Sequence, residues 1–170
     1  KYFKDDKIYV EFIVWYKNGQ KNLEGQYKDG KLDGKWTDWY KNSQKEGETN
    51  YKDGKKDGWV IFWYENGQKR YEGNYIDDKH NGKWTYWYED GQIEAETNYK
   101  DGRLIDKRTV WYENGQIKEE QNYKDGDPDG KQTGWHENGQ KDYDWYYKDG
   151  KYDGWVIFWY ENGQKMSEGK

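Results

Sequence analysis

The chain has 170 residues, of which 29 are Lys or Arg and 34 are Asp or Glu, so its formal net charge is −5. This balance argues against a nucleic-acid binder that neutralises phosphates, because that class needs an excess of basic side chains on one face. The chain has no cysteine, which excludes disulfides and thiol chemistry, and no apolar run approaches the ~18 residues of a membrane-spanning helix.

Aromatic residues take the place of aliphatic ones in this chain. Val, Ile, Leu and Phe together number only 20, a level that usually indicates disorder. The chain also has 12 Trp and 19 Tyr, and each buried aromatic side chain hides roughly 150–250 Å². We therefore expect a folded protein whose core is aromatic.

A period of 24 residues runs through the chain without insertion. It aligns Trp15, Trp39, Trp63, Trp87, Trp111, Trp135 and Trp159 in one column. Seven units tile residues 3–170, namely 3–26, 27–50, 51–74, 75–98, 99–122, 123–146 and 147–170. Such regular self-similarity predicts a single repeat array.

Each unit predicts two short strands, which the third unit illustrates. Residues 59–64 are dense in aromatic and β-branched side chains, which favours a strand. Asn66-Gly67 predicts a two-residue type I′ turn with positive φ at both positions, which would set Tyr64 opposite Lys69. Residues 68–75 then return as the second strand.

The turn-rich link from Asp77 to Gly82 leads to the next hairpin. Repeated along the chain, this unit predicts an all-β fold: an elongated, twisted, single-layer antiparallel meander of about seven stacked β-hairpins.

This register assigns the side chains to two faces. One face carries Val60, Phe62 and Tyr71, and we expect it to form the core. On that face, Tyr51 and Tyr75 are expected to cover the bare backbone of Gly34 and Gly58. The opposite face carries the tryptophan column among Thr, Lys and Glu side chains.

Two interpretations of the tryptophan column are open. The rings can stabilise the layer by lying over cross-strand neighbours, or they can anchor a partner, since Trp is favoured at interfaces. The segments Gly58 to Lys69 and Gly154 to Lys165 are identical, and they add Trp59 and Trp155 to this face. The candidate partner-binding residues here are Trp39, Trp59, Trp63, Trp87, Trp111, Trp135, Trp155 and Trp159.

Units five and six depart from the pattern. Unit five carries Ile105-Asp106 in place of an Asp-Gly pair, and its Arg103, Leu104 and Arg108 are further candidates for partner binding. Unit six has Gly134 where other units have a bulky ring, and we expect Trp145 to fill that space. Irregular positions of this kind are where a particular partner would be recognised.

A calcium-binding loop is the one metal motif that the chain resembles. Asp125, Asp127 and Asp129 match its opening, but the twelfth position, which should be Glu, is His136. An ordinary turn stiffened by Pro128 is the simpler interpretation. We therefore predict no metal site.

No grouping of side chains predicts catalysis. The acidic column has the composition of a glycosidase pair, but equivalent positions in a regular ladder lie ~9.6 Å apart, which favours a solvated column. No nucleophile stands beside a base. We expect no enzymatic activity and no cofactor. The column consists of Glu24, Glu48, Glu72, Glu96, Glu120 and Glu168.

The recurring strings Trp111-Tyr112-Glu113-Asn114-Gly115-Gln116 and Tyr27-Lys28-Asp29-Gly30-Lys31-Leu32-Asp33-Gly34-Lys35-Trp36 resemble the bacterial variant of the MORN repeat. The resemblance covers residues 3–170. It implies stacked β-hairpins and a non-enzymatic interaction module without catalytic residues. Some members of this variant family are labelled antitoxins, and others occur in surface proteins linked to adhesion or invasion.

Together these observations predict a non-catalytic scaffold that binds another protein through its aromatic sheet surface, as an inhibitor or antitoxin does, or by adhesion at a surface. The alternative is a carbohydrate- or choline-type cell-wall binding module that uses Trp and Tyr platforms. Exposed edges in the first and last units leave end-to-end self-association open. A bacterial cytoplasm and a cell surface are both compatible with the sequence.

Overall fold

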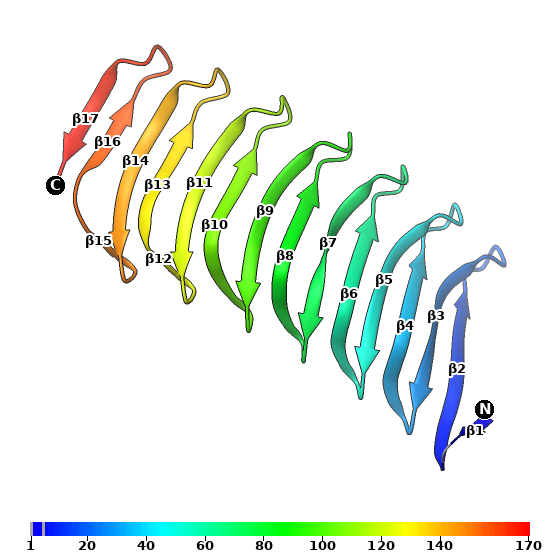
Figure 1. The fold of residues 1–170 in the computed structure, drawn as a ribbon. Coiled ribbons are helices and arrows are strands. Elements are labelled where there is room, and N and C mark those ends of the chain that lie inside the picture. The colour runs from blue at the N-terminus through cyan, green and yellow to red at the C-terminus, as the bar shows by residue number, and fades with distance from the viewer. Residues whose placement is uncertain (1, 5) are drawn as a thin grey trace. The chain divides into compact units, whose positions relative to one another are not determined.

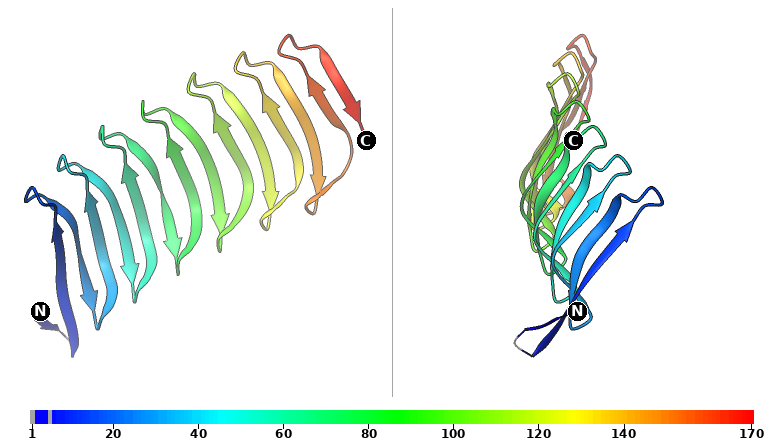
Figure 2. Two further views of the ribbon diagram at one scale, coloured as in Figure 1. Left: turned by 180° about the vertical axis from the view of Figure 1, so that it is seen from behind. Right: turned by 90° about the vertical axis from the view of Figure 1, so that its right-hand side faces the viewer.

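The computed structural model describes residues 2–4 and 6–170, in which the regular structure is entirely β. The chain divides into two compact units. The first runs to Asn81 and includes Glu89–Gly91, and the second consists of Gly82–Tyr88 and Gln92–Lys170. Figure 1 shows each unit as a row of antiparallel strands, and Figure 2 shows that the strands of each unit lie in one layer.

In the first unit, each strand pairs with the next strand in the sequence. The strands are β1 (Tyr2–Lys4), β2 (Lys7–Trp15), β3 (Lys21–Lys28), β4 (Lys31–Trp39), β5 (Lys45–Lys52), β6 (Lys55–Trp63) and β7 (Lys69–Ile76).

The second unit is also built of antiparallel hairpins. Strand β8 (Lys79–Trp87) belongs to it from Gly82 onward. The remaining strands are β9 (Ile93–Lys100), β10 (Arg103–Trp111), β11 (Ile117–Lys124), β12 (Asp127–Pro128), β13 (Gly130–Trp135), β14 (Lys141–Lys148), β15 (Lys151–Tyr152), β16 (Val156–Trp159) and β17 (Lys165–Gly169). The predicted all-β hairpin meander is confirmed within each unit.

The Asn-Gly turns differ from the prediction. In β6–β7, Gly67 N–H donates to Tyr64 O over 2.9 Å, and Tyr64 N–H donates to Gln68 O over 2.8 Å. Gly67 has a φ of 85°, but Asn66 is not at positive φ. This is a three-residue loop with a glycine bulge, not a type I′ turn. As a result, Lys69 lies opposite Trp63 instead of Tyr64.

Type I′ turns occur instead at the Asp-Gly links, which the sequence indicated only as turn-rich connections. Between β3 and β4, Lys28 pairs with Lys31, and only Asp29 and Gly30 lie between them. Their φ angles are 48° and 80°. Positive φ at both central residues matches the right-handed twist of the flanking strands, so the link is itself a tight hairpin.

A second glycine shapes several of the long strands. Gly58 in β6 has a φ of 105°, and the register of β5 against β6 shifts just before it, between Thr49 and Tyr51. A residue in the left-handed region at a β-bulge bends the strand. The bowed outline of the longer strands is visible in Figure 2.

The aromatic face, which carries Trp36, Val60 and Trp84 in the middle of β4, β6 and β8, holds the core. These three side chains are 5%, 2% and 2% exposed. In the first unit, the ring of Trp36 meets the rings of Tyr27 and Tyr51 edge-on, with centroids 5.1 and 6.3 Å apart. Neighbouring rings therefore bury one another in the absence of a second layer.

The expected pairing of Tyr51 with Gly34 and of Tyr75 with Gly58 is confirmed in the register. The rings of Tyr51 and Tyr75, however, do not cover Gly34 and Gly58; other rings cover other glycines. A Cβ on Gly25 would overlap the Trp36 ring, whereas at Gly34 the nearest atom would be 3.9 Å away. Packing between neighbouring hairpins thus requires glycine.

Gly47 lies in the same way beneath the ring of Phe62. In the sixth repeat, Tyr143, not Trp145, covers Gly134, because Tyr143 is the residue directly opposite it.

Candidate functional site

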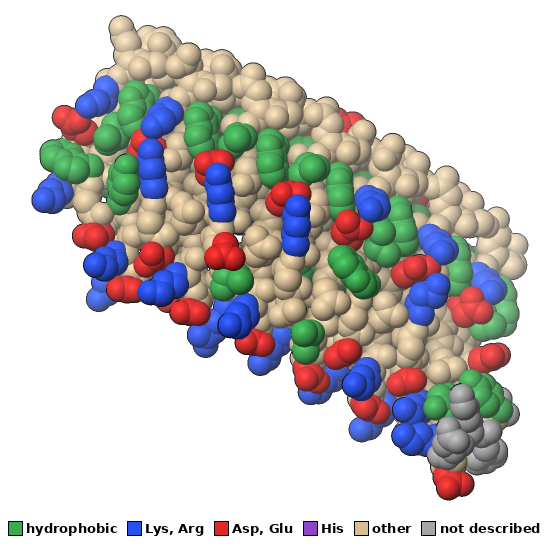
Figure 3. Space-filling model, in the orientation of Figure 1, with side chains coloured by type: hydrophobic (Ala, Val, Ile, Leu, Met, Phe, Trp, Pro, Cys, Tyr) green, Lys and Arg blue, Asp and Glu red, His purple; other side chains and the backbone are tan. Residues whose placement is uncertain are grey.

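The Trp face, opposite the aromatic face, carries the tryptophan column together with columns of Lys, Thr and acidic side chains. Figure 3 shows hydrophobic side chains interleaved with Lys and acidic side chains on one face of the molecule. Trp15 is 56% exposed. The remaining members of the column, Trp39, Trp63, Trp87, Trp111, Trp135 and Trp159, are half-buried.

Lysines from the preceding hairpin cover some of the column rings. Lys21 Nζ lies 5.5 Å from the centroid of the Trp39 ring, and Lys141 Nζ lies 5.2 Å from that of Trp159. The bulge after each Asn-Gly turn places Lys21 opposite Trp15, so the lysine projects from the Trp face toward the next repeat. The ring surface there is partly occupied by cation–π contacts.

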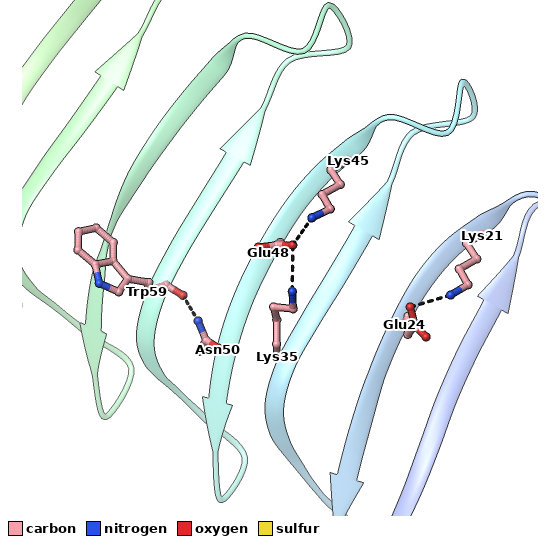
Figure 4. Close-up of polar contacts among 7 residues, drawn as sticks. All are labelled: Lys21, Glu24, Lys35, Lys45, Glu48, Asn50 and Trp59. Carbon is pink, nitrogen blue, oxygen red and sulfur yellow. Dashed lines mark hydrogen bonds and ion pairs between the residues drawn. The ribbon is translucent and has the colours of Figure 1, made fainter.

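Acidic side chains alternate with these lysines. Glu48 accepts hydrogen bonds from Lys45 over 2.6 Å and from Lys35 over 3.3 Å, and Lys21 pairs with Glu24 over 2.8 Å (Figure 4). Partial burial acts to raise the pKa of Glu48, but the two lysines outweigh it and hold the pKa below its ordinary value. The acidic column is therefore paired as well as solvated.

Trp59 is the most prominent side chain of this face. Its indole is 61% exposed, while its main-chain oxygen accepts a hydrogen bond from Asn50 Nδ2 over 2.7 Å (Figure 4). Trp155, at the same position of the seventh repeat, is 50% exposed. The strand position is fixed through the backbone, so the ring is presented to solvent on a rigid support.

A hydrogen-bond ladder that the sequence analysis missed joins successive hairpins. The hydroxyl of Tyr16 donates to Trp39 O, and that of Tyr40 donates to Trp63 O, each over 2.7 Å. The same bond recurs from Tyr88 and Tyr112, and His136 Nε2 lies 3.1 Å from Trp159 O.

The turn asparagines form a second ladder beside it. Asn66 Oδ1 accepts from Gln68 N–H over 2.9 Å, and Asn66 Nδ2 donates to Glu89 O over 2.7 Å. The sequence does contain a sign of both ladders, because Tyr and Asn recur at the same positions in successive repeats.

Two of the three candidates of the fifth repeat, Arg108 and Leu104, do not lie on the Trp face. Arg108 lies on the aromatic face opposite Gln121, whose Oε1 accepts from Arg108 Nη1 over 2.9 Å. Leu104 lies opposite Tyr99 near the type I′ turn, and Arg103 is exposed beside that turn. Arg108 and Leu104 therefore mark a different surface from the tryptophans.

The three aspartates of the calcium-like motif are spread over a turn and a strand. Asp125 is the first residue of a type I′ turn, Asp127 begins β12, and Asp129 Oδ2 accepts from Asp149 N–H over 3.2 Å. Within residues 2–4 and 6–170, no three His, Cys, Asp or Glu side chains form a group that could hold a metal ion. The same residues contain no helix long and apolar enough to span a membrane.

Each unit thus carries exposed tryptophans, Trp15 and Trp59 in the first and Trp155 in the second, beside ion-paired Lys and acidic side chains. No curated protein matches the chain. A family model described as "MORN repeat variant" matches residues 32–53, 56–77, 81–101, 107–125 and 128–149. These segments make up more than half of the 170 residues and follow the hairpin repeat. The chain therefore belongs to the MORN repeat variant family.

Proposed function

We propose that this chain is a non-catalytic scaffold that binds a protein partner through the Trp face. The observation that carries this proposal is Trp59, whose indole is 61% exposed on a strand fixed by hydrogen bonds. Energetically dominant interface residues are often tryptophans with a polar rim around them. The Lys and Glu side chains of this face supply such a rim.

Comparison among the repeats supports a role for this ring. Where the third and seventh repeats carry Trp59 and Trp155, four of the other five carry lysines that pair with the acidic column, and the first carries Glu11. These lysines are Lys35, Lys83, Lys107 and Lys131. Replacing such a lysine by an exposed indole gives up an ion pair and exposes apolar surface, which a partner would cover.

Two kinds of bacterial partner suit such a surface. One is a protein that is neutralised when the scaffold covers it, as with an inhibitor or antitoxin. The other is a surface protein to which the scaffold attaches in adhesion. Self-association is a separate possibility, because every residue of the last strand, β17, is exposed.

Choline-type binding on the tryptophan column is less well supported. The rings of Trp39 and Trp159 already have a lysine ammonium over them. A quaternary ammonium ligand would have to displace that cation from each ring.

The test replaces Trp59 and Trp155 by the lysine that four other repeats carry at this position, as Trp59→Lys with Trp155→Lys. Affinity capture from the source bacterium, quantified by mass spectrometry, should recover a specific protein with the wild-type chain. We expect the double variant to recover it at least tenfold less, since an anchor residue typically contributes more than about 2 kcal/mol.

The matched control is Ile76→Lys, which also installs the lysine of other repeats at an exposed position but lies at the end of β7. It should recover as much partner as the wild type. Equal recovery by the double variant, or no protein above background, would refute the proposal. Light scattering on the purified chain reports separately whether it binds its own copies.

A further inference from the structure

The middle row of the aromatic face changes character in the second unit. In the first unit this row runs through Trp36, Thr49, Val60 and Gly73, which lie opposite one another on β4 to β7. In the second unit, Arg108 lies opposite Gln121, and Gln132 lies opposite Trp145. Long polar side chains thus occupy places that elsewhere hold a ring or a small side chain.

A hollow of about 200 Å³ opens where Arg108 follows Thr97 in this row. The Thr97 side chain is 2% exposed, and its hydroxyl oxygen has no hydrogen-bond partner in the described part of the chain. A buried hydroxyl without a partner is costly, which indicates a position that a ligand atom would complete. The lining consists of Tyr86, Glu94, Ala95, Thr97, Tyr99 and Arg108.

A second hollow, of about 100 Å³, lies farther along the same row and is lined by Gln121 and Trp145, among others. The indole nitrogen of Trp145 is buried and, among the described residues, also lacks a hydrogen-bond partner. Because Arg108 in the first hollow bonds Gln121 in the second over 2.9 Å, the two hollows are neighbours. Each of two neighbouring hollows is therefore lined by a residue that has a buried polar atom without a hydrogen-bond partner.

The charges around the hollows are balanced. The guanidinium of Arg108 lies 3.6 Å from the carboxylate of Glu119, and Glu94 lines the first hollow. An anionic ligand would meet these carboxylates, and a cationic one would meet Arg108. A neutral ligand with both donors and acceptors fits the site better than either.

We propose that these adjacent hollows bind a neutral oligosaccharide. Sugar hydroxyls both donate and accept, so they can satisfy the Thr97 hydroxyl and the Trp145 N–H at once. The C–H faces of a sugar ring can lie against Tyr86 and Tyr99, which line the first hollow. Two neighbouring hollows suit two linked rings better than one. This site is independent of the protein-binding function proposed for the Trp face.

The direct test is a titration followed by NMR, using cellotriose, maltotriose and chitotriose as probes. The indole N–H signal of Trp145, assigned with the Trp145→Phe variant, should shift in a saturable way with at least one trisaccharide. Because the hollows are smaller than the ~300–1,000 Å³ of typical sites for drug-sized ligands, we expect millimolar dissociation constants.

The discriminating variant is Thr97→Val, which removes the unpaired hydroxyl and keeps the shape. It should weaken sugar binding about tenfold, as expected for loss of one good hydrogen bond. It should also raise the melting temperature, because the variant no longer buries a hydroxyl group that lacks a hydrogen-bond partner. Weaker binding in a more stable protein cannot arise from general damage to the fold.

The matched control is Thr49→Val in the first unit, where the buried threonine faces Val60 instead of an arginine. It should leave sugar binding unchanged, as should Trp59→Lys on the other face. Arg108→Val, which installs the residue of the third repeat, should abolish binding. The proposal fails if no trisaccharide gives a saturable shift, if Thr97→Val and Thr49→Val act alike, or if glucuronate or inorganic phosphate binds more tightly.

Discussion

Asp144 shows how an acidic side chain can be buried on a solvated face. It is 4% exposed, and its carboxylate accepts hydrogen bonds from Thr133 Oγ1 and Lys141 over 2.7 Å each. Lys131 Nζ lies 2.9 Å away. Burial acts to raise the pKa of Asp144, but these donors outweigh it and hold the pKa below its ordinary value.

This carboxylate should therefore contribute to acid sensitivity. Because its folded pKa is lowered, its contribution to stability is present above the unfolded pKa and is lost as pH falls through the folded pKa. Asp144→Asn should lower the free energy of unfolding by about 2 kcal/mol at pH 7. The difference from wild type should shrink in urea titrations as pH falls below about 4.

Glu72→Gln is the control, since Glu72 occupies the same column but is more exposed and pairs with Lys69 at the surface. It should cost less than about 1 kcal/mol. A pH-independent difference between Asp144→Asn and wild type would contradict this account.

At the scale of the strand, β10 contains a backbone conformation that its residue does not favour. Asp106 has a φ of 59° where other repeats place glycine, for example Gly82 with a φ of 73°. The left-handed region costs a residue with a Cβ roughly 1–2 kcal/mol, partly offset because glycine loses more freedom on folding. Asp106→Gly should therefore stabilise the protein by about 0.5–1 kcal/mol, measured by urea unfolding.

The reverse substitution, Gly82→Asp, isolates the backbone effect. A Cβ on Gly82 would have no atom within 4 Å, so no steric clash contributes. It should destabilise the protein by a similar amount. If Asp106→Gly instead destabilises, the Asp106 side chain must make a contribution larger than the strain.

The turns show how far the sequence predicts such elements. Hairpins, their order and their register away from the turns follow from the pattern of apolar residues and the Gly positions. The turn types do not, because Asn-Gly and Asp-Gly both permit type I′. What distinguishes the two turns is a side-chain contact: in the Asn-Gly turn, Gln68 N–H donates to Asn66 Oδ1, and this bond accompanies the glycine bulge.

The candidate site, too, is predictable only in part, because side-chain contacts decide which residues are exposed. The period identifies the face on which Trp39 and Trp59 lie. Their exposure depends on a neighbour that the period does not specify, since Lys21 lies over Trp39 whereas Trp59 is left open. The polar row around Arg108 stood out as irregular, but its unpaired hydroxyl at Thr97 depends on side-chain positions in three dimensions.

At the scale of the whole molecule, the ladders link residues 23 apart, so each hairpin depends mainly on its neighbours. Deleting residues 27–50, one full period, would bring Tyr16 and Asn18 into register with Trp63 and Glu65. We expect the shortened chain to fold, with a free energy of unfolding lower by about 1–4 kcal/mol, in proportion to the 24 residues removed. Circular dichroism and chemical unfolding measure this.

Deleting residues 27–38, half a period, serves as the control, because it removes all of β4 except Trp39 and puts the ladder residues out of phase. That chain should aggregate or lose its near-ultraviolet signal. Similar behaviour of the two deletions would show that the period is not the unit of stability.

The bonds that align the hairpins end on main-chain oxygens, for example at Trp63 from Tyr40 and at Glu89 from Asn66. Because these acceptors are main-chain atoms, the hydrogen bonds fix the position of the strand and do not depend on which side chain the accepting residue carries. Lysine and tryptophan already exchange at the position of Trp59 among the repeats. Surface positions of this kind can diversify independently, so one architecture can acquire new recognition properties by substitution alone.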